Sequence, residues 1–365
     1  MTSRAGIIVK EDSPYLALCR SRILINITNK ILTNKIEVKP SEDWVERLWK
    51  WADENKIDDL HTVKKGFNQK YNRGMPRDKE ALLNLEELNL YKYDLTYLPK
   101  EIGNLKKLKK LHLYKNRLRV LPKEIAALTN LTELSLSKNN LTKLPCEIGQ
   151  LENLEVLSIL GNKLIELPAK IGELKNLMKL NLLGNKLKFL PNELCQLKKL
   201  VSLSLFDNEL IELPKDIGCL ENLTELLINN NALTKLPDSI GDLKNLEYLW
   251  VYENRLTAIP ASIGKLKKLT DLWIYENKLN ELPNEIGALD NLKELWISKN
   301  NISALPQSIG NLKELEQFNL SKNNLLSLPL ELMSLDKLTW LEVDRHISMP
   351  TELDSLVKKN IINFA

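Results

Sequence analysis

The sequence predicts an α/β solenoid, in which a right-handed coil carries a curved parallel sheet on its concave face and a helical cap at each end. The first observation behind this prediction is a 23-residue pattern, LxxLxLxxNxLxxLPxxIxxLxx, that recurs from Leu85 onward. The second is that its first six positions alternate as a short strand does, whereas the later part contains a proline, which cannot donate to a sheet ladder. Stacked units therefore place their strands about 4.8 Å apart, and a wider outer layer bends the stack into an arc.

The repeats occupy residues 85–344 without an insertion. A degenerate twelfth unit begins at Leu338. The eleven full units begin at Leu85, Leu108, Leu131, Leu154, Leu177, Leu200, Leu223, Leu246, Leu269, Leu292 and Leu315. Because each unit repeats the last in register, residues at the same position are expected to form rows along the sheet.

Position nine of the repeat is asparagine in ten successive units. These residues are Asn116, Asn139, Asn162, Asn185, Asn208, Asn231, Asn254, Asn277, Asn300 and Asn323. A side-chain amide both donates and accepts, so each can bond backbone groups of neighbouring coils that would otherwise cost about 1 to 3 kcal/mol apiece. Tyr93 and His346 replace asparagine in the end units, where no further coil requires a partner.

The segments that flank the repeats are predicted to cap the exposed ends of the core. Residues 41–84 are expected to form a helical N-terminal cap, with Trp44, Leu48 and Trp51 on one helix face and Ser41 as the N-cap. Pro76 is expected to begin a second short helix within this cap. Residues 1–40 fit neither the cap nor the repeat, and are interpreted as an N-terminal arm that is either weakly packed or disordered.

Residues 345–365 are predicted to form a C-terminal cap helix. The apolar residues Leu353, Leu356, Val357 and Ile361 would lie on one side of this helix and cover the last coil.

The repeat resembles the leucine-rich repeat proteins. The LPxxIxxL return with its 23-residue period is similar to the intracellular class of Ras-suppressor and Scribble-type proteins and of many bacterial proteins. The resemblance implies protein binding on the concave face. If the source is a bacterium, it further implies an effector translocated into a host cell, where it would act on a host protein.

Composition gives no indication of nucleic-acid binding, a disulfide framework or a membrane span. The formal charge is +4, from 52 basic and 48 acidic residues, which is close to balance for 365 residues. Four cysteines are scattered, which favours a reducing compartment such as the cytoplasm. No apolar run approaches the roughly 18 residues of a spanning helix.

No pattern of catalytic residues is present in the sequence. The three histidines, His61, His112 and His346, lie far apart and have no metal-ligand spacing. Neither a GxxxxGK[ST] nor a GxGxxG motif occurs. Only about 20 residues follow the last strand, too few for the ubiquitin-ligase domain that some bacterial relatives carry. We therefore predict a protein that is not an enzyme and has no cofactor and no metal.

The positions that face away from the core become aromatic in units eight to ten. Position five changes from small polar residues to tryptophan, and position seven carries tyrosine beside it. The predicted protein-binding residues are Phe206, Leu227, Tyr248, Trp250, Tyr252, Glu253, Asp271, Trp273, Tyr275, Glu276, Glu294 and Trp296. Two interpretations remain open: the rings pack on each other and stiffen the sheet, or they form an exposed interaction patch, which we favour.

The charge around these aromatic residues predicts the chemistry of the partner. An acidic rim favours a protein that presents Lys or Arg together with apolar groups, through charge pairing and cation–π contacts. The alternative is a self-associating structural scaffold, in which a homodimer buries the aromatic residues. Binding of nucleic acid or of an anionic membrane by the lysines of the first repeats is the least favoured interpretation.

Overall fold

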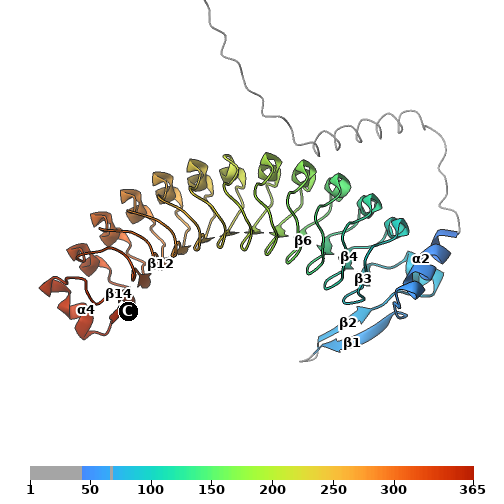
Figure 1. Ribbon diagram of the computed structural model, residues 1–365, viewed down its shortest axis with the longest axis horizontal. Coiled ribbons are helices and arrows are strands. Elements are labelled where there is room, and N and C mark those ends of the chain that lie inside the picture. The colour runs from blue at the N-terminus through green and yellow to red at the C-terminus, as the bar shows by residue number, and fades with distance from the viewer. Residues whose placement is uncertain (1–42, 66–68) are drawn as a thin grey trace, which may run out of the picture.

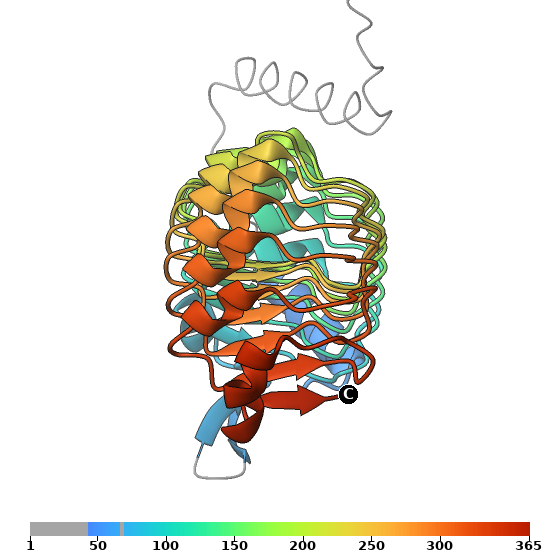
Figure 2. The same cartoon turned by 90° about the vertical axis from the view of Figure 1, so that its left-hand side faces the viewer.

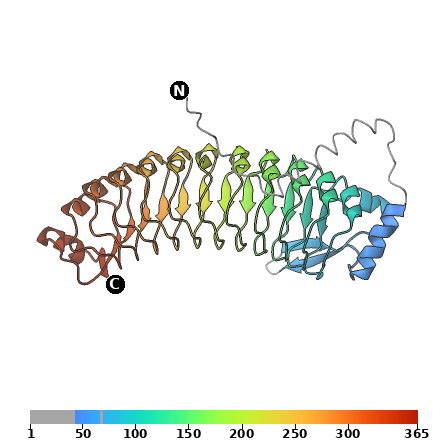
Figure 3. The same ribbon diagram turned by 45° about the horizontal axis from the view of Figure 1, so that its top comes forward.

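The computed structural model describes residues 43–65 and 69–365, which form one continuous arc (Figure 1). A 13-stranded sheet lines the concave side, and short helices lie on the convex side. The strands follow chain order from one end of the sheet to the other (Figure 3). The predicted α/β solenoid with a curved parallel sheet is therefore confirmed.

Each repeat contributes one three- or four-residue strand. The ladder is parallel, and each residue pairs with the residue 23 positions further along, as Leu249 does with Leu272. The strands are β3 Glu87–Asn89, β4 Lys110–His112, β5 Glu133–Ser135, β6 Val156–Ser158, β7 Lys179–Asn181, β8 Ser202–Ser204, β9 Glu225–Leu227, β10 Tyr248–Trp250, β11 Asp271–Trp273, β12 Glu294–Trp296, β13 Gln317–Asn319 and β14 Trp340–Val343.

The return segments form 3₁₀ helices that stack along the convex side (Figure 2). Most begin directly after the repeat proline, whose carbonyl accepts the first turn's hydrogen bond, as Pro168 does from Ile171 at 2.9 Å. They are η1 Lys100–Asn104, η2 Lys123–Ala127, η3 Cys146–Gln150, η4 Ala169–Glu173, η5 Asn192–Gln196, η6 Ile217–Cys219, η7 Asp238–Asp242, η8 Ala261–Lys265, η9 Asn284–Ala288, η10 Gln307–Asn311 and η11 Leu330–Ser334. Successive helices approach closely: a Cβ on Gly172 would lie 2.2 Å from the carbonyl oxygen of Glu193.

The position-nine asparagines form the predicted ladder inside the coil. Asn162 Nδ2 donates to the carbonyls of Leu136 and Ile159, each at 3.0 Å, and its Oδ1 accepts from the backbone N–H of Leu141 at 3.0 Å. One side chain thus satisfies three backbone groups, two of which belong to the preceding coil. This arrangement confirms the role predicted for these residues.

The N-terminal cap begins with helix α2, Asp43–Glu54, which buries Trp44, Leu48 and Trp51 as predicted. The predicted N-cap Ser41 and the predicted arm, residues 1–40, lie outside the described residues. The second expected helix is α3, Lys79–Leu83, but its cap is Asp78, whose Oδ1 accepts from the N–H of Ala81 at 2.7 Å. Pro76 therefore precedes the helix and does not begin it.

The N-terminal cap also contains a β-hairpin that the helical prediction lacks. Strand β1, His61–Lys65, pairs antiparallel with β2, Gln69–Arg73. The hairpin joins the main sheet through Gly74, whose N–H donates to the carbonyl of Asn89 at 3.2 Å. It lies beside the first repeats on the concave side of the arc (Figure 1).

The C-terminal cap differs from the single helix predicted for residues 345–365. Its helical part is short, with η12 Thr351–Leu353 followed by α4 Asp354–Lys358, and the described chain then forms strand β15, Ile362–Phe364. The expected apolar residues do pack on the core, with Leu353 fully buried. Strand β15 pairs in parallel with β14, because the edge of β14 would otherwise present unpaired backbone groups to solvent.

Candidate protein-binding surface

Three tryptophans stand side by side on strands β10, β11 and β12. Because the ladder is parallel and in register, Trp250 pairs with Trp273, and Trp273 with Trp296. The rings of Trp250 and Trp273 are stacked, with centroids 4.4 Å apart and an interplanar angle of 2°. The Trp273 and Trp296 centroids are 5.4 Å apart at 35°.

A second row of rings follows two residues further along each coil. Tyr252 and Tyr275 are stacked with centroids 4.3 Å apart and an interplanar angle of 9°. This row touches the first one, since the Tyr252 ring lies 6.4 Å from that of Trp273 and the Tyr275 ring 6.3 Å from that of Trp296. The two rows therefore form one aromatic cluster on the concave side of the sheet.

The structure adds a fourth indole that the sequence analysis missed. Trp340 on β14 stacks on Trp296, with centroids 5.8 Å apart and an interplanar angle of 30°. It occupies position three of the degenerate unit, whereas the other indoles occupy position five, so a comparison of equal positions does not include it. We call the set Trp250, Tyr252, Trp273, Tyr275, Trp296 and Trp340 the aromatic stack.

The rings of the aromatic stack are half-buried, because they cover each other. The indole N–H of Trp273 donates to Glu294 Oε2 at 3.2 Å. Those of Trp250 and Trp296 are shielded from solvent and have no partner among the described residues. Ring packing, the structural interpretation, is thus observed, and only part of each ring remains open to a partner.

Two predicted site residues lie apart from this cluster. Leu227 was expected on the exposed face but is only 9% exposed, because it is the ladder neighbour of the larger Trp250. Phe206 is half-buried. The buried Asn229, at the same position of the next repeat, separates Phe206 from Tyr252. Tyr248 is the most open of the predicted aromatic residues, with 39% of its surface exposed.

Acidic residues lie near the rings of the stack, and some of them already have partners. Glu276 forms an ion pair with Lys299. Asp271 and Glu294 are neighbours in the ladder. Burial, together with the nearby Asp271 carboxylate, raises the pKa of Glu294. Burial and the Tyr252 hydroxyl beside it also raise the pKa of Tyr275.

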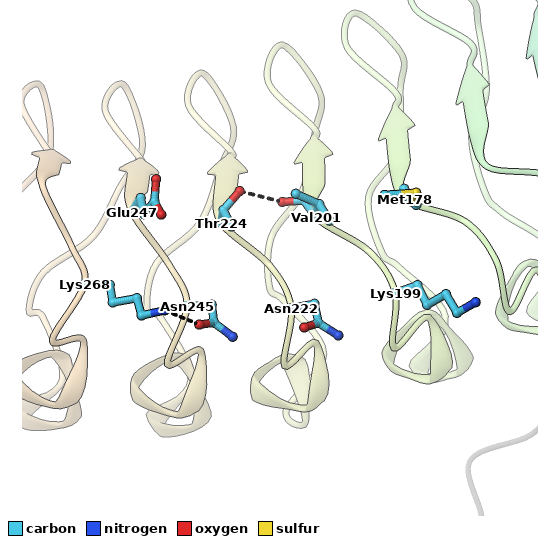
Figure 4. A pocket seen from close by; sticks show the side chains of 8 residues that line it. All are labelled: Met178, Lys199, Val201, Asn222, Thr224, Asn245, Glu247 and Lys268. Carbon is cyan, nitrogen blue, oxygen red and sulfur yellow. Dashed lines mark hydrogen bonds between the residues drawn. The ribbon is translucent and has the colours of Figure 1, made fainter.

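A shallow groove of about 390 Å³ runs beside the stack, where strands β7 to β10 begin. It is lined by Met178, Lys199, Val201, Asn222, Thr224, Asn245, Glu247 and Lys268. Figure 4 shows these side chains spread over successive coils, with Lys268 Nζ donating to Asn245 Oδ1 at 2.8 Å. The side chains that line the groove do not bring a nucleophile and a base together.

Two further features bear on function in the part of the chain that the structure describes. No group of three or more His, Cys, Asp or Glu residues there is placed to hold a metal ion. No helix among these residues is both long and apolar enough to pass through a bilayer.

The fold defines a repeat solenoid whose concave sheet is free to carry a recognition surface. The family described as leucine-rich repeat region matches residues 69–162, 133–226 and 215–300, which together cover more than half of the chain. The family described as Leucine Rich Repeat matches residues 291–312. The chain therefore belongs to the leucine-rich repeat family, whose members commonly act as protein-interaction modules.

Solved structures give the same result. A leucine-rich repeat protein of Leptospira interrogans is 38% identical, with a TM-score of 0.55, and the match covers 79% of this chain and 86% of that chain. A plant peptide hormone receptor, solved in complex with RGF2, is 33% identical with a TM-score of 0.64. That match covers 79% of this chain and 51% of the receptor chain.

An internalin of Listeria monocytogenes is 22% identical, with a TM-score of 0.61 over 89% of this chain and 96% of that chain, and it supports the fold alone. The search of curated proteins found no match to this sequence.

Proposed function

We propose that the protein is a non-enzymatic recognition module that binds another protein on its concave face, at the aromatic stack. The observation that carries this proposal is the continuous set of six rings on and just after the strands between β10 and β14. Packing of the core does not require these residues, because the core is formed by the leucines and isoleucines on the opposite side of each strand. Trp and Tyr in such central clusters often contribute about 2 kcal/mol or more each to binding.

The chemistry of the surface indicates the chemistry of the partner. Glu253 lies beside the tyrosine row and forms no ion pair among the described residues, and Asp271 lies beside the tryptophans. A partner that packs apolar groups against the rings and presents Lys or Arg to these carboxylates would match both the aromatic and the acidic part of the surface. Cation–π contacts with the exposed parts of the ring faces would add about 0.5 to 2 kcal/mol each.

The setting of this function is also part of the proposal. The 23-residue LPxxI repeat favours the intracellular, Ras-suppressor and Scribble-like class, and the scattered cysteines favour a cytoplasmic site of action. The similarity to a Leptospira protein supports a bacterial source. We therefore infer an effector that acts on a host protein in the host cytosol.

The test is a pull-down from host-cell extract with the wild type and with the triple variant Trp250→Ala, Trp273→Ala, Trp296→Ala. We expect the triple variant to lose the partner while its circular dichroism still shows a folded solenoid. A matched control replaces by Ala three exposed apolar residues that follow the ladder asparagine in their repeats, Ile165, Phe189 and Ile211. This control should retain the partner.

Two outcomes would contradict the proposal. If the folded tryptophan variant retains the same partners as the wild type, the aromatic stack is not the binding site. If light scattering shows a wild-type dimer and a monomeric tryptophan variant, the stack serves self-association. The protein is then the self-associating scaffold of the alternative hypothesis, and the stack does not bind a different protein.

A further inference from the structure

We propose that the first repeats bind an acidic segment of the partner, through Lys92, Lys115 and Lys138, which we call the lysine row. This inference rests on the proposed function, because it assigns a second contact to the same concave face. The three residues occupy position eight of successive repeats, and their side chains are exposed. Their φ angles of 58°, 56° and 53° show that all three adopt the same left-handed backbone conformation.

Two stacked tyrosine rings lie close to the ammonium groups of the lysine row. The rings of Tyr91 and Tyr114 are stacked, with centroids 5.5 Å apart and an interplanar angle of 8°. Lys115 Nζ lies 5.9 Å from the Tyr91 centroid and 5.4 Å from that of Tyr114. Lys138 Nζ lies 5.8 Å from the Tyr114 centroid. The rings thus hold two ammonium groups near the sheet without neutralising their charge.

The lysine row differs from its basic neighbours in lacking acidic partners. Lys109 is paired with Glu86 at 2.8 Å, and Lys110 lies 3.7 Å from Glu133. Among residues 43–65 and 69–365, no carboxylate forms an ion pair with any member of the lysine row. Three unneutralised charges in line are therefore available to an incoming anionic group.

The hairpin of the N-terminal cap extends this basic end. Arg73, at the end of β2, lies over the ring of Tyr93 with its Cζ 4.2 Å from the ring centroid. Its Nη2 donates to the carbonyl of Lys92 at 3.4 Å. The hairpin lies beside the first repeats (Figure 3), so a positively charged side chain stands at the end of the row.

The sign of the charge changes along the same row, and this limits the length of the acidic occupant. After Lys138, position eight is occupied by Gly161, Gly184, Asp207, Asn230, Glu253 and Glu276, and then by Lys299 and Lys322. Lys299 is already paired with Glu276. A long polyanion such as a nucleic acid would meet these carboxylates, whereas a short acidic segment would not. From Lys138 to Asp207, the first of these carboxylates, there are three strand spacings, about 14 Å, which about four extended residues can span.

The experiment is a fluorescence anisotropy titration with a labelled peptide of alternating Glu and Gly at low salt. The variant Lys92→Gln, Lys115→Gln, Lys138→Gln should bind at least about tenfold more weakly than the wild type, since three charge contacts are lost. The matched control Lys163→Gln, Lys186→Gln, Lys278→Gln removes the same net charge from three exposed lysines elsewhere on the coils. It should change the affinity by less than about twofold.

Either of two results would overturn the inference: an equal loss of affinity in both triple variants, or a DNA duplex that binds the wild type more tightly than the acidic peptide and displaces it. The two proposals fail separately. The tryptophan triple variant should still bind the acidic peptide even if it captures no protein. If the wild type does not bind the acidic peptide, the pull-down can still show that the aromatic stack binds a partner.

Discussion

The indole of Trp250 lies parallel to that of Trp273, with an interplanar angle of 2° and 4.4 Å between ring centroids. This geometry follows from the repeat, because a 23-residue period brings the same side chain to adjacent strands of a parallel ladder. Each ring thereby becomes part of its neighbour's environment. Stability and recognition consequently depend on the same residues.

The central ring of the tryptophan row should contribute more to stability than the end ring. Trp273 contacts Trp250, Trp296 and Tyr252. Among the described residues, Trp250 has one ring contact, with Trp273. Since a stacked pair contributes about 0.5 to 1.5 kcal/mol, Trp273→Ala should cost about 1 kcal/mol more than Trp250→Ala. Urea denaturation of both variants measures the difference, and equal midpoints would show that ring stacking adds nothing to stability.

The asparagine ladder should be a principal source of cohesion between coils. Asn162→Ala would leave the N–H of Leu141 and the carbonyls of Leu136 and Ile159 without this partner. We expect a loss of about 2 to 4 kcal/mol, measured as the shift in the urea midpoint. The control is Asn153→Ala, which removes a single exposed hydrogen bond to the carbonyl of Thr129.

The Asn153→Ala variant should lose less than about 1 kcal/mol. Similar losses in the two asparagine variants would indicate that water replaces the buried hydrogen bonds of Asn162.

Ionisation of Glu294 should destabilise the folded protein. Burial and the nearby Asp271 raise its pKa above the value in the unfolded chain, so the folded state holds the proton more tightly. The contribution of this group to stability therefore falls as pH rises from the unfolded-state pKa, about 4.3, through the folded-state pKa, and the loss is complete above it. Glu294→Gln, which keeps an oxygen for the indole of Trp273, should be more stable than the wild type at neutral pH.

The advantage of the Glu294→Gln variant should shrink as pH is lowered towards the unfolded-state pKa. Thermal unfolding of both proteins over a pH series measures this effect. A constant difference at every pH would show that the carboxyl group does not titrate differently in the folded and unfolded states.

The repeats could be predicted from the sequence in detail because each position of the pattern occurs in many successive units. An isolated Leu249 says little, but the same residue type at every equivalent position shows that these side chains face the core. The cap lacks this redundancy. The hairpin β1–β2 comes from a single polar stretch, and its pairing depends on contacts with the first repeat, such as that of Gly74 with Asn89.

The candidate surface was predicted as a set of positions, and the structure shows how their side chains share space. Leu227 and Trp250 occupy the same repeat position, yet one is buried and the other half-buried, because a large ring covers its smaller neighbour. Trp340 occupies a different position and still joins the aromatic stack. Neither result follows from repeat positions alone, because both depend on the size and direction of neighbouring side chains.

The sequence by itself therefore determined the solenoid, its parallel sheet, its asparagine ladder and the strands that carry aromatic residues, since a strict period translates directly into stacked coils. Only the tertiary structure decided how the ends are closed, with a hairpin at one end and strand β15 at the other. It also decided which rings stack and which lysines remain unpaired. The physical reason is that local spacing fixes a repeating backbone, whereas these features arise from contacts between side chains on different coils.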